Sequence, residues 1–221
     1  MSTAIVVPEL PADQAPTGDE AASRPRLSLV NAPAGLQGSV LVVCRGNICR
    51  SPVAEALLAH ALQGTGVSVS SAGLSARTGE TISEPMAELL PRALRASTAD
   101  FAARSVDESL ISSSDLILTA TRSQRGELVV RQPSALRKTF TLREFASLAE
   151  LLRQDLDGAG GQLPTRLSEL VASVPTARGR RPLRDNEFDV PDPYGRSVRA
   201  NRRSYAMIEE SVAIIATALR P

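Results

Sequence analysis

Short apolar runs alternate with segments of helical periodicity through most of this 221-residue chain. The first run, at 40–43, is continuous rather than alternating, which is typical of a strand buried on both faces. Further strands are predicted at 67–71, 115–118 and 138–142, and helices at 53–61, 86–94, 121–131, 142–156 and 205–219. Strands that alternate with helices predict an α/β fold, with a parallel sheet covered by helices on both faces.

Two segments depart from this alternation. Residues 1–37 contain five prolines, scattered charges and few large apolar residues, so they cannot bury enough surface to offset their ordering entropy. We expect a disordered tail there and a single domain over 38–221. Residues 157–186 combine a glycine-rich stretch, one helical pattern and an arginine cluster at 178–184, and we interpret them as an insertion in that domain.

Composition narrows the class of protein. The chain has 25 Lys+Arg and 24 Asp+Glu residues, and a formal net charge of +1 argues against nucleic-acid binding. No run of about 18 apolar residues occurs, and the N-terminus does not resemble a signal peptide, so we expect a cytoplasmic protein without membrane insertion. Two cysteines are too few for a disulfide scaffold, and no cluster of residues has metal-ligand spacing. We therefore expect neither a metal nor another cofactor.

The segment richest in chemical information is CRGNICRSP at residues 44–52, between the first predicted strand and the first predicted helix. Parallel α/β sheets bind ligands beyond the carboxyl ends of their strands, and a helix N-terminus attracts anions. Ser51 is a good N-cap for the helix, and its hydroxyl can alternatively, or in addition, donate a hydrogen bond to a Cys44 thiolate. Gly46 can adopt a positive φ and Asn47 tolerates the left-handed region, so the loop can turn its amides inward. Arg50 can then bind two phosphate oxygens with its planar guanidinium group.

Cys44 lies at the base of this loop. The helix dipole and the Arg50 guanidinium, which suit a phosphate, also stabilise a thiolate, the nucleophilic form of cysteine. Taken alone, Cys44 equally fits a small core residue at the end of a buried strand. The conjunction of strand, cysteine, Gly-Asn, arginine, Ser-Pro and helix favours the catalytic interpretation. His60 is the single histidine and lies more than two turns beyond Ser51, which removes Cys–His hydrolase mechanisms.

These residues resemble the signature C-x5-R-[ST] of the low-molecular-weight protein tyrosine phosphatases. The match continues through Ala54-Glu55-Ala56 and covers about 38–156 and 187–220. The resemblance implies a doubly wound, four-stranded parallel sheet with helices on both faces. It also implies that Cys44 and Arg50 are catalytic. The loop residues that it assigns to substrate binding are Arg45, Gly46, Asn47, Ile48, Cys49 and Ser51.

A phosphate ester cleaved by a thiolate leaves an alkoxide or phenoxide that needs a proton. The family places its general acid in an Asp-Pro pair near the C-terminus, which here is Asp192-Pro193, followed by Tyr194. Asp189 is the rival candidate, but no proline follows it. We therefore expect Asp192 to be the general acid and Tyr194 to form one wall of the substrate site. The resemblance also suggests that Asn47 holds the shape of the loop, together with Ser71.

The expected substrate depends on two positions near the loop. The family usually carries an aromatic residue shortly after a Ser-Ala-Gly segment, whereas this chain has Leu74-Ser75-Ala76-Arg77 and so lacks that wall of the site. Ile48 stands where the arginine-phosphatase branch has threonine, and an apolar residue there favours an aryl phosphate. The resemblance thus implies phosphotyrosine hydrolysis, with tyrosine-phosphorylated proteins and a bacterial tyrosine kinase as partners.

Three other functions remain open: a protein arginine phosphatase, an arsenate reductase on the same fold, and a catalytically silent phosphoprotein-binding module. Thioredoxin-coupled arsenate reductases need further cysteines downstream, and no cysteine follows Cys49. Cys49 itself has two interpretations. It either forms a readily reduced disulfide with an oxidised Cys44, making the enzyme redox-sensitive, or packs as a small apolar residue.

Overall fold

The computed structural model describes residues 36–162, 164–178 and 187–220. The predicted tail up to residue 35 and most of the arginine cluster lie outside the described residues. The elements, in chain order, are β1 (Gln37–Cys44), α1 (Arg50–Ala61), β2 (Gly66–Gly73), α2 (Glu84–Ala87), α3 (Arg92–Ser97), α4 (Glu108–Ser113), β3 (Leu116–Thr119), α5 (Arg122–Arg131), the 3-10 helix η1 (Pro133–Lys138), β4 (Thr139–Thr141), α6 (Leu142–Gly158), α7 (Leu167–Arg178) and α8 (Val198–Leu219).

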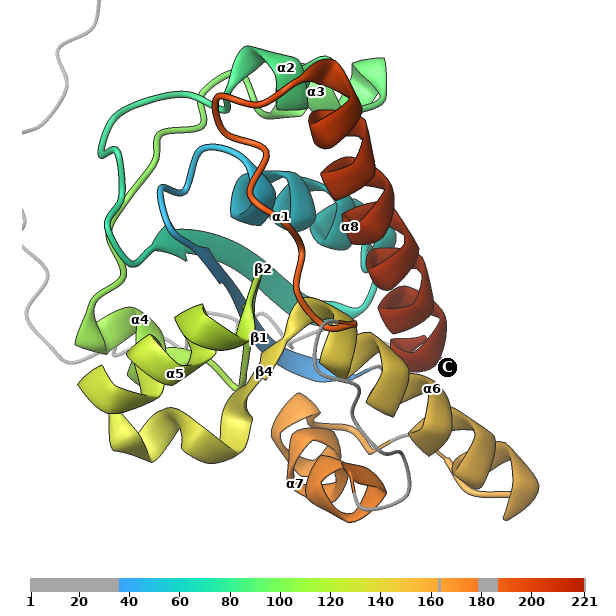
Figure 1. The fold of residues 1–221 in the computed structure, drawn as a ribbon. Coiled ribbons are helices and arrows are strands. Elements are labelled where there is room, and N and C mark those ends of the chain that lie inside the picture. Colours follow the sequence, from blue (N-terminus) through green and yellow to red (C-terminus); the bar gives the residue numbers. More distant parts are fainter. Residues whose placement is uncertain (1–35, 163, 179–186, 221) are drawn as a thin grey trace, which may run out of the picture. The chain divides into compact units, whose positions relative to one another are not determined.

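The four strands form one parallel sheet in the order β2-β1-β3-β4. The chain passes from β1 to β2 on one side and then crosses to β3 and β4 on the other, so the sheet is doubly wound. Figure 1 shows α1 and α8 on one face of the sheet, with α4 and α5 on the opposite face. The predicted fold class is confirmed.

Alternate side chains of β1 enter two separate cores. Val40 and Val42 pack in the larger core with residues of α1, α6, α7 and α8. Leu41 and Val43 belong to the smaller core, which includes residues of α4 and α5. All four side chains are buried, so the continuous apolar run is a strand buried on both faces, as its composition predicts.

Most predicted elements are present, with one error. The four predicted strands occur, and the helices predicted at 53–61, 121–131, 142–156 and 205–219 correspond to α1, α5, α6 and α8. The helix predicted at 86–94 is wrong, because the chain forms the two short helices α2 and α3 instead. Pro91 precedes α3 and has no N–H to continue the first helix. The short elements α4 and η1 have no counterpart in the apolar periodicity.

The folded part includes some residues of the predicted tail at 1–37 and of the predicted insertion at 157–186. Gln37 begins β1 and Leu36 is buried, although both residues were assigned to the predicted tail. Helix α7, within the predicted insertion, buries Leu167 and Val174 in the larger core. In the ranges that the structure describes, no helix is both long and apolar enough to cross a membrane.

The topology determines where the site forms. Strand β1 lies between β2 and β3, so the loop after β1 sits at the point where the strand order reverses, which is the usual ligand site of such sheets. The segment before α8 reaches the same end of the sheet, where the Val190 N–H donates to the Ala120 carbonyl at 2.8 Å. Residues from both ends of the chain therefore meet beyond the carboxyl ends of β1 and β3.

Candidate active site

Backbone hydrogen bonds fix the loop between β1 and α1 from one side. Its carbonyl oxygens accept N–H donors from the segment 74–83, which follows β2. The pairs are Cys44 with Leu74 (3.0 Å), Arg45 with Ser75 (2.9 Å), Gly46 with Arg77 (3.0 Å) and Ile48 with Ser83 (2.7 Å). Because these carbonyls point toward the segment 74–83, the loop turns its N–H groups away from it.

The amides of this loop are available to a ligand. Within the described part of the chain, the N–H groups of residues 45–49 donate to no other group. Asn47 adopts the left-handed backbone conformation with φ 56°, as predicted, whereas Gly46 does not have a positive φ. The N-terminus of α1 has no side-chain cap. Unpaired amides beside an uncapped helix N-terminus form an anion-binding site.

Gly73, the last residue of β2, allows the loop to lie close to the sheet. A Cβ atom at this position would lie 2.7 Å from the carbonyl oxygen of Arg45 and 3.0 Å from the backbone nitrogen of Asn47. Both contacts are with backbone atoms, which cannot rotate away. A side chain at position 73 would therefore displace the loop.

A cavity of about 170 Å³ lies over the loop. The residues that line it are Cys44, Arg45, Gly46, Ile48, Cys49, Arg50, Ser75, Arg77, Asp192 and Tyr194. The structure thus brings together all the predicted site residues except Asn47 and Ser51, which are completely buried beside the loop. Among the described residues, no three His, Cys, Asp or Glu side chains are close enough to hold a metal ion.

The side chain of Cys44 is buried in the lining of this cavity. Its Sγ atom lies 3.0 Å from the Oγ atom of Ser51. The predicted N-cap role of Ser51 is wrong, because α1 already begins at Arg50 and Cys49 occupies the N-cap position. Ser51 is inside the first turn of the helix, and its hydroxyl contacts Cys44 instead of capping the helix.

Asn47 determines the direction of the hydrogen bonds behind the loop. Its Oδ1 accepts the Arg104 N–H at 2.9 Å, so its Nδ2 group must act as the donor to Ser51 Oγ, also at 2.9 Å. Ser51 keeps its own hydrogen for another acceptor. The two acceptors near it are Cys44 Sγ at 3.0 Å and the Ala72 carbonyl at 3.4 Å. The shorter distance favours donation to Cys44.

The same amide connects the loop to a half-buried carboxylate. Asn47 Nδ2 also donates to Ser71 Oγ at 2.8 Å, and Ser71 donates to Glu55 Oε2 at 2.6 Å. Burial raises the pKa of Glu55, while the hydrogen bond from Ser71 opposes that rise. The pairing of Asn47 with Ser71 was predicted. Glu55 was missed, although its position one helical turn after Ser51 placed it on the same side of α1.

Arg50 offers an unused donor to the cavity. Its Nη1 donates to the Val190 carbonyl at 3.1 Å, and its Nη2 lies 3.1 Å from Asp192 Oδ1. Its Nε is buried and has no hydrogen-bond partner among the described residues. A buried N–H without an acceptor is costly, so this atom favours an anion in the cavity.

The two candidate acids occupy different places. Asp192 lines the cavity and contacts Arg50, and its side chain is 54% exposed. Asp189 instead accepts the backbone N–H of Arg122 at 2.8 Å, at the start of α5. Of the two, Asp192 is therefore the one placed to exchange a proton with a ligand in the cavity. Asp189 instead attaches the segment before Asp192 to the start of α5.

Tyr194 forms one wall of the cavity, as predicted, and remains half exposed. The guanidinium carbon of Arg77 lies 4.7 Å from the centroid of its ring. Sequence reasoning identified the missing aromatic residue near position 77. It missed the contact with Tyr194, because the two residues are far apart in the chain and no periodicity relates them.

Cys49 also lines the cavity, but a different hydroxyl contacts it. Its Sγ lies 3.1 Å from Ser83 Oγ, and the residue is buried. Burial raises the pKa of the Cys49 thiol above its ordinary value, although the hydrogen bond with Ser83 opposes this change. Both cysteines are free thiols in the structure.

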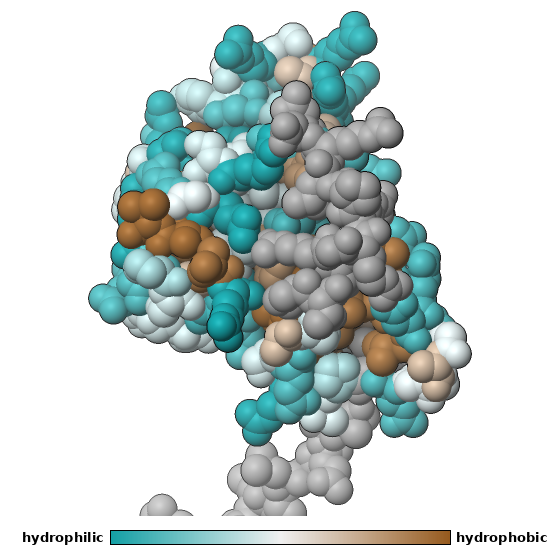
Figure 2. Space-filling model, turned by 60° about the horizontal axis from the view of Figure 1, so that its bottom comes forward, coloured by the Kyte–Doolittle hydropathy of each residue, from teal (hydrophilic) through white to brown (hydrophobic). Residues whose placement is uncertain are grey.

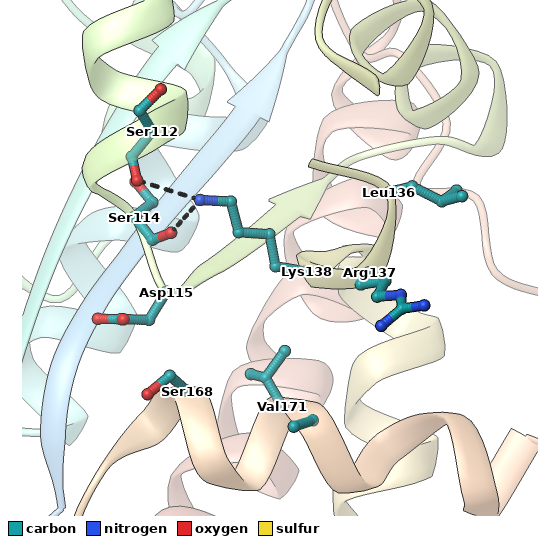
Figure 3. Close-up of a pocket in the computed structure, with 9 residues that line it drawn as sticks. Ser112, Ser114, Asp115, Leu136, Arg137, Lys138, Ser168 and Val171 are labelled. Carbon is teal, nitrogen blue, oxygen red and sulfur yellow. Dashed lines mark hydrogen bonds between the residues drawn. The ribbon is translucent and has the colours of Figure 1, made fainter. Parts of the chain in front are cut away.

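A larger cavity, of about 800 Å³, lies at the amino-terminal end of the strands (Figure 3). Lys138 Nζ donates to the carbonyl oxygens of Ser112 (3.2 Å) and Ser114 (2.7 Å), at the C-terminal end of α4. Asp115 accepts a backbone N–H from β1. Figure 2 shows hydrophobic surface among polar side chains on the face that the turn from Figure 1 brings forward. Leu136, which lines the cavity, is 51% exposed. Lys138 and Asp115 of this cavity thus make structural contacts.

A doubly wound parallel sheet with an anion-binding loop at its switch point, beginning at a buried cysteine, defines a class of phosphate-binding α/β enzymes. Residues 39–158 match the family described as low molecular weight phosphotyrosine protein phosphatase, and the chain belongs to this family.

The relatives include proteins named as tyrosine phosphatases and a protein named as an arginine phosphatase. The chain is 30% identical over 174 residues to the probable low molecular weight protein-tyrosine-phosphatase EpsP of Ralstonia solanacearum, across 79% of this chain and 90% of that protein. It is 36% identical over 108 residues to a protein-arginine-phosphatase of Geobacillus stearothermophilus, across 49% of this chain and 71% of that protein. The solved structure of the tyrosine phosphatase AmsI of Erwinia amylovora has a TM-score of 0.58 and 25% identity, over 83% of this chain and 94% of that one.

Proposed function

We propose that this enzyme hydrolyses phosphotyrosine in proteins through a phosphocysteine intermediate. Cys44 is the nucleophile, Arg50 binds the phosphate, and Asp192 is the general acid and base. The observation that carries the proposal is the convergence of unpaired donors on one thiol. The loop amides at 45–49 and Arg50 Nε lack other partners in the described residues, and all of these residues except Asn47 line the cavity together with Cys44.

In the first step, the Cys44 thiolate attacks phosphorus and the bond from phosphorus to the tyrosine oxygen breaks. Asp192 gives its proton to the departing oxygen, so the product is a neutral phenol. Negative charge on the transferring group increases the demand for donors at its equatorial oxygens. The loop amides and the Arg50 guanidinium meet that demand without reorganisation.

In the second step, a water molecule attacks the phosphocysteine and the phosphorus–sulfur bond breaks. The Asp192 carboxylate takes a proton from this water, phosphate leaves, and Cys44 returns as a thiolate. Ser51 donates a hydrogen bond to the Cys44 sulfur, both in the resting enzyme and when the sulfur leaves phosphorus in the second step. The hydrogen bond from Asn47 to Ser51 supports this role.

Two features of the cavity favour an aryl phosphate. Ile48 gives it an apolar side chain, and Tyr194 gives it an aromatic wall. Both complement the ring of phosphotyrosine. Tyrosine-phosphorylated proteins, including a bacterial tyrosine kinase, are therefore the partners that we propose.

The similarity to a protein-arginine-phosphatase makes phosphoarginine the second candidate substrate. Matched peptides that differ only in phosphotyrosine or phosphoarginine separate the two. An arsenate-reduction assay tests the third alternative. Because Cys44 and Cys49 are the only cysteines in the sequence, no downstream thiol can pass on a disulfide.

The decisive experiment is the trapping of the intermediate. We expect wild-type protein to hydrolyse para-nitrophenyl phosphate and a phosphotyrosyl peptide, and to show a phosphate adduct on Cys44 by mass spectrometry after rapid acid quench. Cys44→Ser should lose essentially all turnover while retaining phosphate binding. Wild-type activity in Cys44→Ser would remove Cys44 as the nucleophile, and an inactive wild type that still binds phosphopeptides would favour a binding module.

A further inference from the structure

We infer that Arg77 is a specificity-determining residue, which selects phosphotyrosine over phosphoarginine by placing a fixed positive charge against the group that carries the phosphate. This inference rests on the proposed function, since it concerns the substrate of the same cavity. It goes beyond the apolar character of Ile48 and the aromatic wall formed by Tyr194.

Backbone contacts fix the position of Arg77. Its N–H donates to the Gly46 carbonyl at 3.0 Å, which attaches it directly to the catalytic loop. Its carbonyl accepts the Glu80 N–H at 3.0 Å, in a tight turn where Gly79 has φ 85°. A positive φ at the third position of such a turn requires glycine or a similar residue. Residue 77 is therefore held at one place beside the loop.

Two side chains then fix the guanidinium group. Arg77 Nη1 donates to Glu80 Oε1 at 3.0 Å, and the guanidinium carbon lies 4.7 Å from the centroid of the Tyr194 ring. The hydrogen bond to Glu80 raises the pKa of Arg77, so the group stays charged. Because Arg77 and Tyr194 both line the cavity, the positive charge belongs to its wall and not only to the surface.

The two candidate substrates respond oppositely to this charge. The ring of phosphotyrosine is neutral and presents a negative π face, which a guanidinium group attracts. The side chain of phosphoarginine is itself a guanidinium cation bonded to phosphorus, so Arg77 repels it. Both substrates carry the same phosphate, which means that the contribution of Arg50 and the loop amides cancels in the comparison.

The three cations of the cavity each pair with a carboxylate, Arg77 with Glu80, so their positions and not their pairing distinguish them. Arg50 pairs with Asp192 across the position of the phosphate, and Arg45 pairs with Glu127 at 2.9 Å on the side of α5. Arg77 is the cation whose guanidinium group packs on the aromatic wall. The substrate side chain must pass this wall.

The test measures kcat/KM for two peptides that differ only in phosphotyrosine or phosphoarginine. The variants are Arg77→Gln, which removes the charge, Arg77→Glu, which reverses it, and Glu80→Gln, which removes the opposing carboxylate. Arg137→Gln is the matched control. Arg137 is exposed and lies before β4, at the opposite end of the sheet, and its substitution changes the net charge by the same amount as Arg77→Gln. Where turnover of the phosphoarginyl peptide is below detection, competitive inhibition of para-nitrophenyl phosphate hydrolysis supplies the same ratio.

We expect the preference for phosphotyrosine to fall about three- to tenfold in Arg77→Gln, as one charge at about 5 Å in a partly solvated site predicts. It should fall further in Arg77→Glu and rise in Glu80→Gln, while Arg137→Gln leaves it unchanged. An equal loss on both peptides in the Arg77 series would show that Arg77 only shapes the cavity and would overturn the inference. A wild type without activity on either peptide would instead overturn the proposed function.

Discussion

The Sγ atom of Cys44 lies 3.0 Å from the Oγ atom of Ser51, and Asn47 leaves Ser51 with its hydrogen available for this contact. A hydrogen bond to a charged group contributes about 1.5–3 kcal/mol. We therefore expect Ser51→Ala to lower kcat about 10- to 100-fold with para-nitrophenyl phosphate. Without the hydrogen bond from Ser51, the Cys44 thiolate is less stabilised, so it is also a poorer leaving group when the phosphocysteine is hydrolysed.

Ser68→Ala is the matched control for this prediction. Ser68 lies on β2 and is exposed, and its hydroxyl contacts the Gly38 carbonyl at 3.4 Å, away from the cavity. Its activity should equal that of wild type. An unchanged kcat in Ser51→Ala would assign the stabilisation of the thiolate to the loop amides and Arg50 alone.

Asp192 and Asp189 allow the same substitution to be compared three residues apart. Asp192→Asn should lower kcat by about 10²- to 10⁴-fold with a strongly basic leaving group, because that oxygen must be protonated as it departs. With para-nitrophenolate, a good leaving group, the loss should be smaller. Asp189→Asn should keep near-normal activity, since an amide oxygen can still accept the Arg122 N–H. Loss of activity in Asp189→Asn instead would exchange the two assignments.

Arg50→Lys tests the geometry of phosphate binding at constant charge. Lysine cannot reproduce the planar guanidinium group of Arg50, whose Nε is buried without a partner among the described residues. We expect kcat/KM to fall about 100-fold, and inorganic phosphate to become a correspondingly weaker inhibitor, because at least one charge-assisted hydrogen bond is lost. Normal kcat/KM in this variant would remove Arg50 from the phosphate site.

Local patterns in the sequence were sufficient to predict the sheet and the loop, whereas the choice of Asp192 came from the resemblance to the family, which an Asp-Pro pair carries. Each depends on neighbouring residues: a continuous apolar run, a Gly-Asn pair before an arginine, a proline after an aspartate. The error at Ser51 has the same origin. A serine followed by proline is a good cap, but α1 begins one residue earlier, at Arg50, so Ser51 lies inside the first turn. The alternative role, a contact with Cys44, is the one that the structure contains.

The contacts that could not be predicted are long-range. The packing of Arg77 on Tyr194 joins segments more than a hundred residues apart, and the Arg104 N–H reaches Asn47 from the segment before α4. No propensity or spacing rule relates such pairs. At Gly46 a local expectation failed. The conformational freedom of this glycine was expected to shape the loop, but Asn47 is the residue with a positive φ. Backbone hydrogen bonds from 74–83 fix the remainder of the loop.

Cys49 is expected to protect Cys44 from irreversible oxidation. Peroxide converts the Cys44 thiolate to a sulfenic acid, and the Cys49 thiol then displaces water to form a disulfide. Since burial raises the pKa of Cys49, the second step should become faster as the pH rises. After peroxide and then a thiol reductant, wild type should recover activity while Cys49→Ser does not, and intact mass should show loss of two hydrogens in the wild type only.

Ser83→Ala gives an independent check on this prediction. It removes the hydroxyl that contacts Cys49 Sγ, a contact that lowers the pKa of this thiol, so disulfide formation should slow at neutral pH. Equal recovery of wild type and Cys49→Ser would leave Cys49 as a packing residue.

Main-chain atoms of 74–83 hold the catalytic loop by its carbonyl oxygens, and this has a consequence for how such an enzyme changes over evolutionary time. The donor at position 77 is a backbone N–H, which every residue except proline supplies. A mutation there can alter the side chain that lines the cavity while the loop keeps its shape. New substrate preferences can thus arise by single substitutions at position 77 without loss of turnover. Gly73 does not tolerate such substitutions, because any side chain there would collide with the Arg45 carbonyl oxygen.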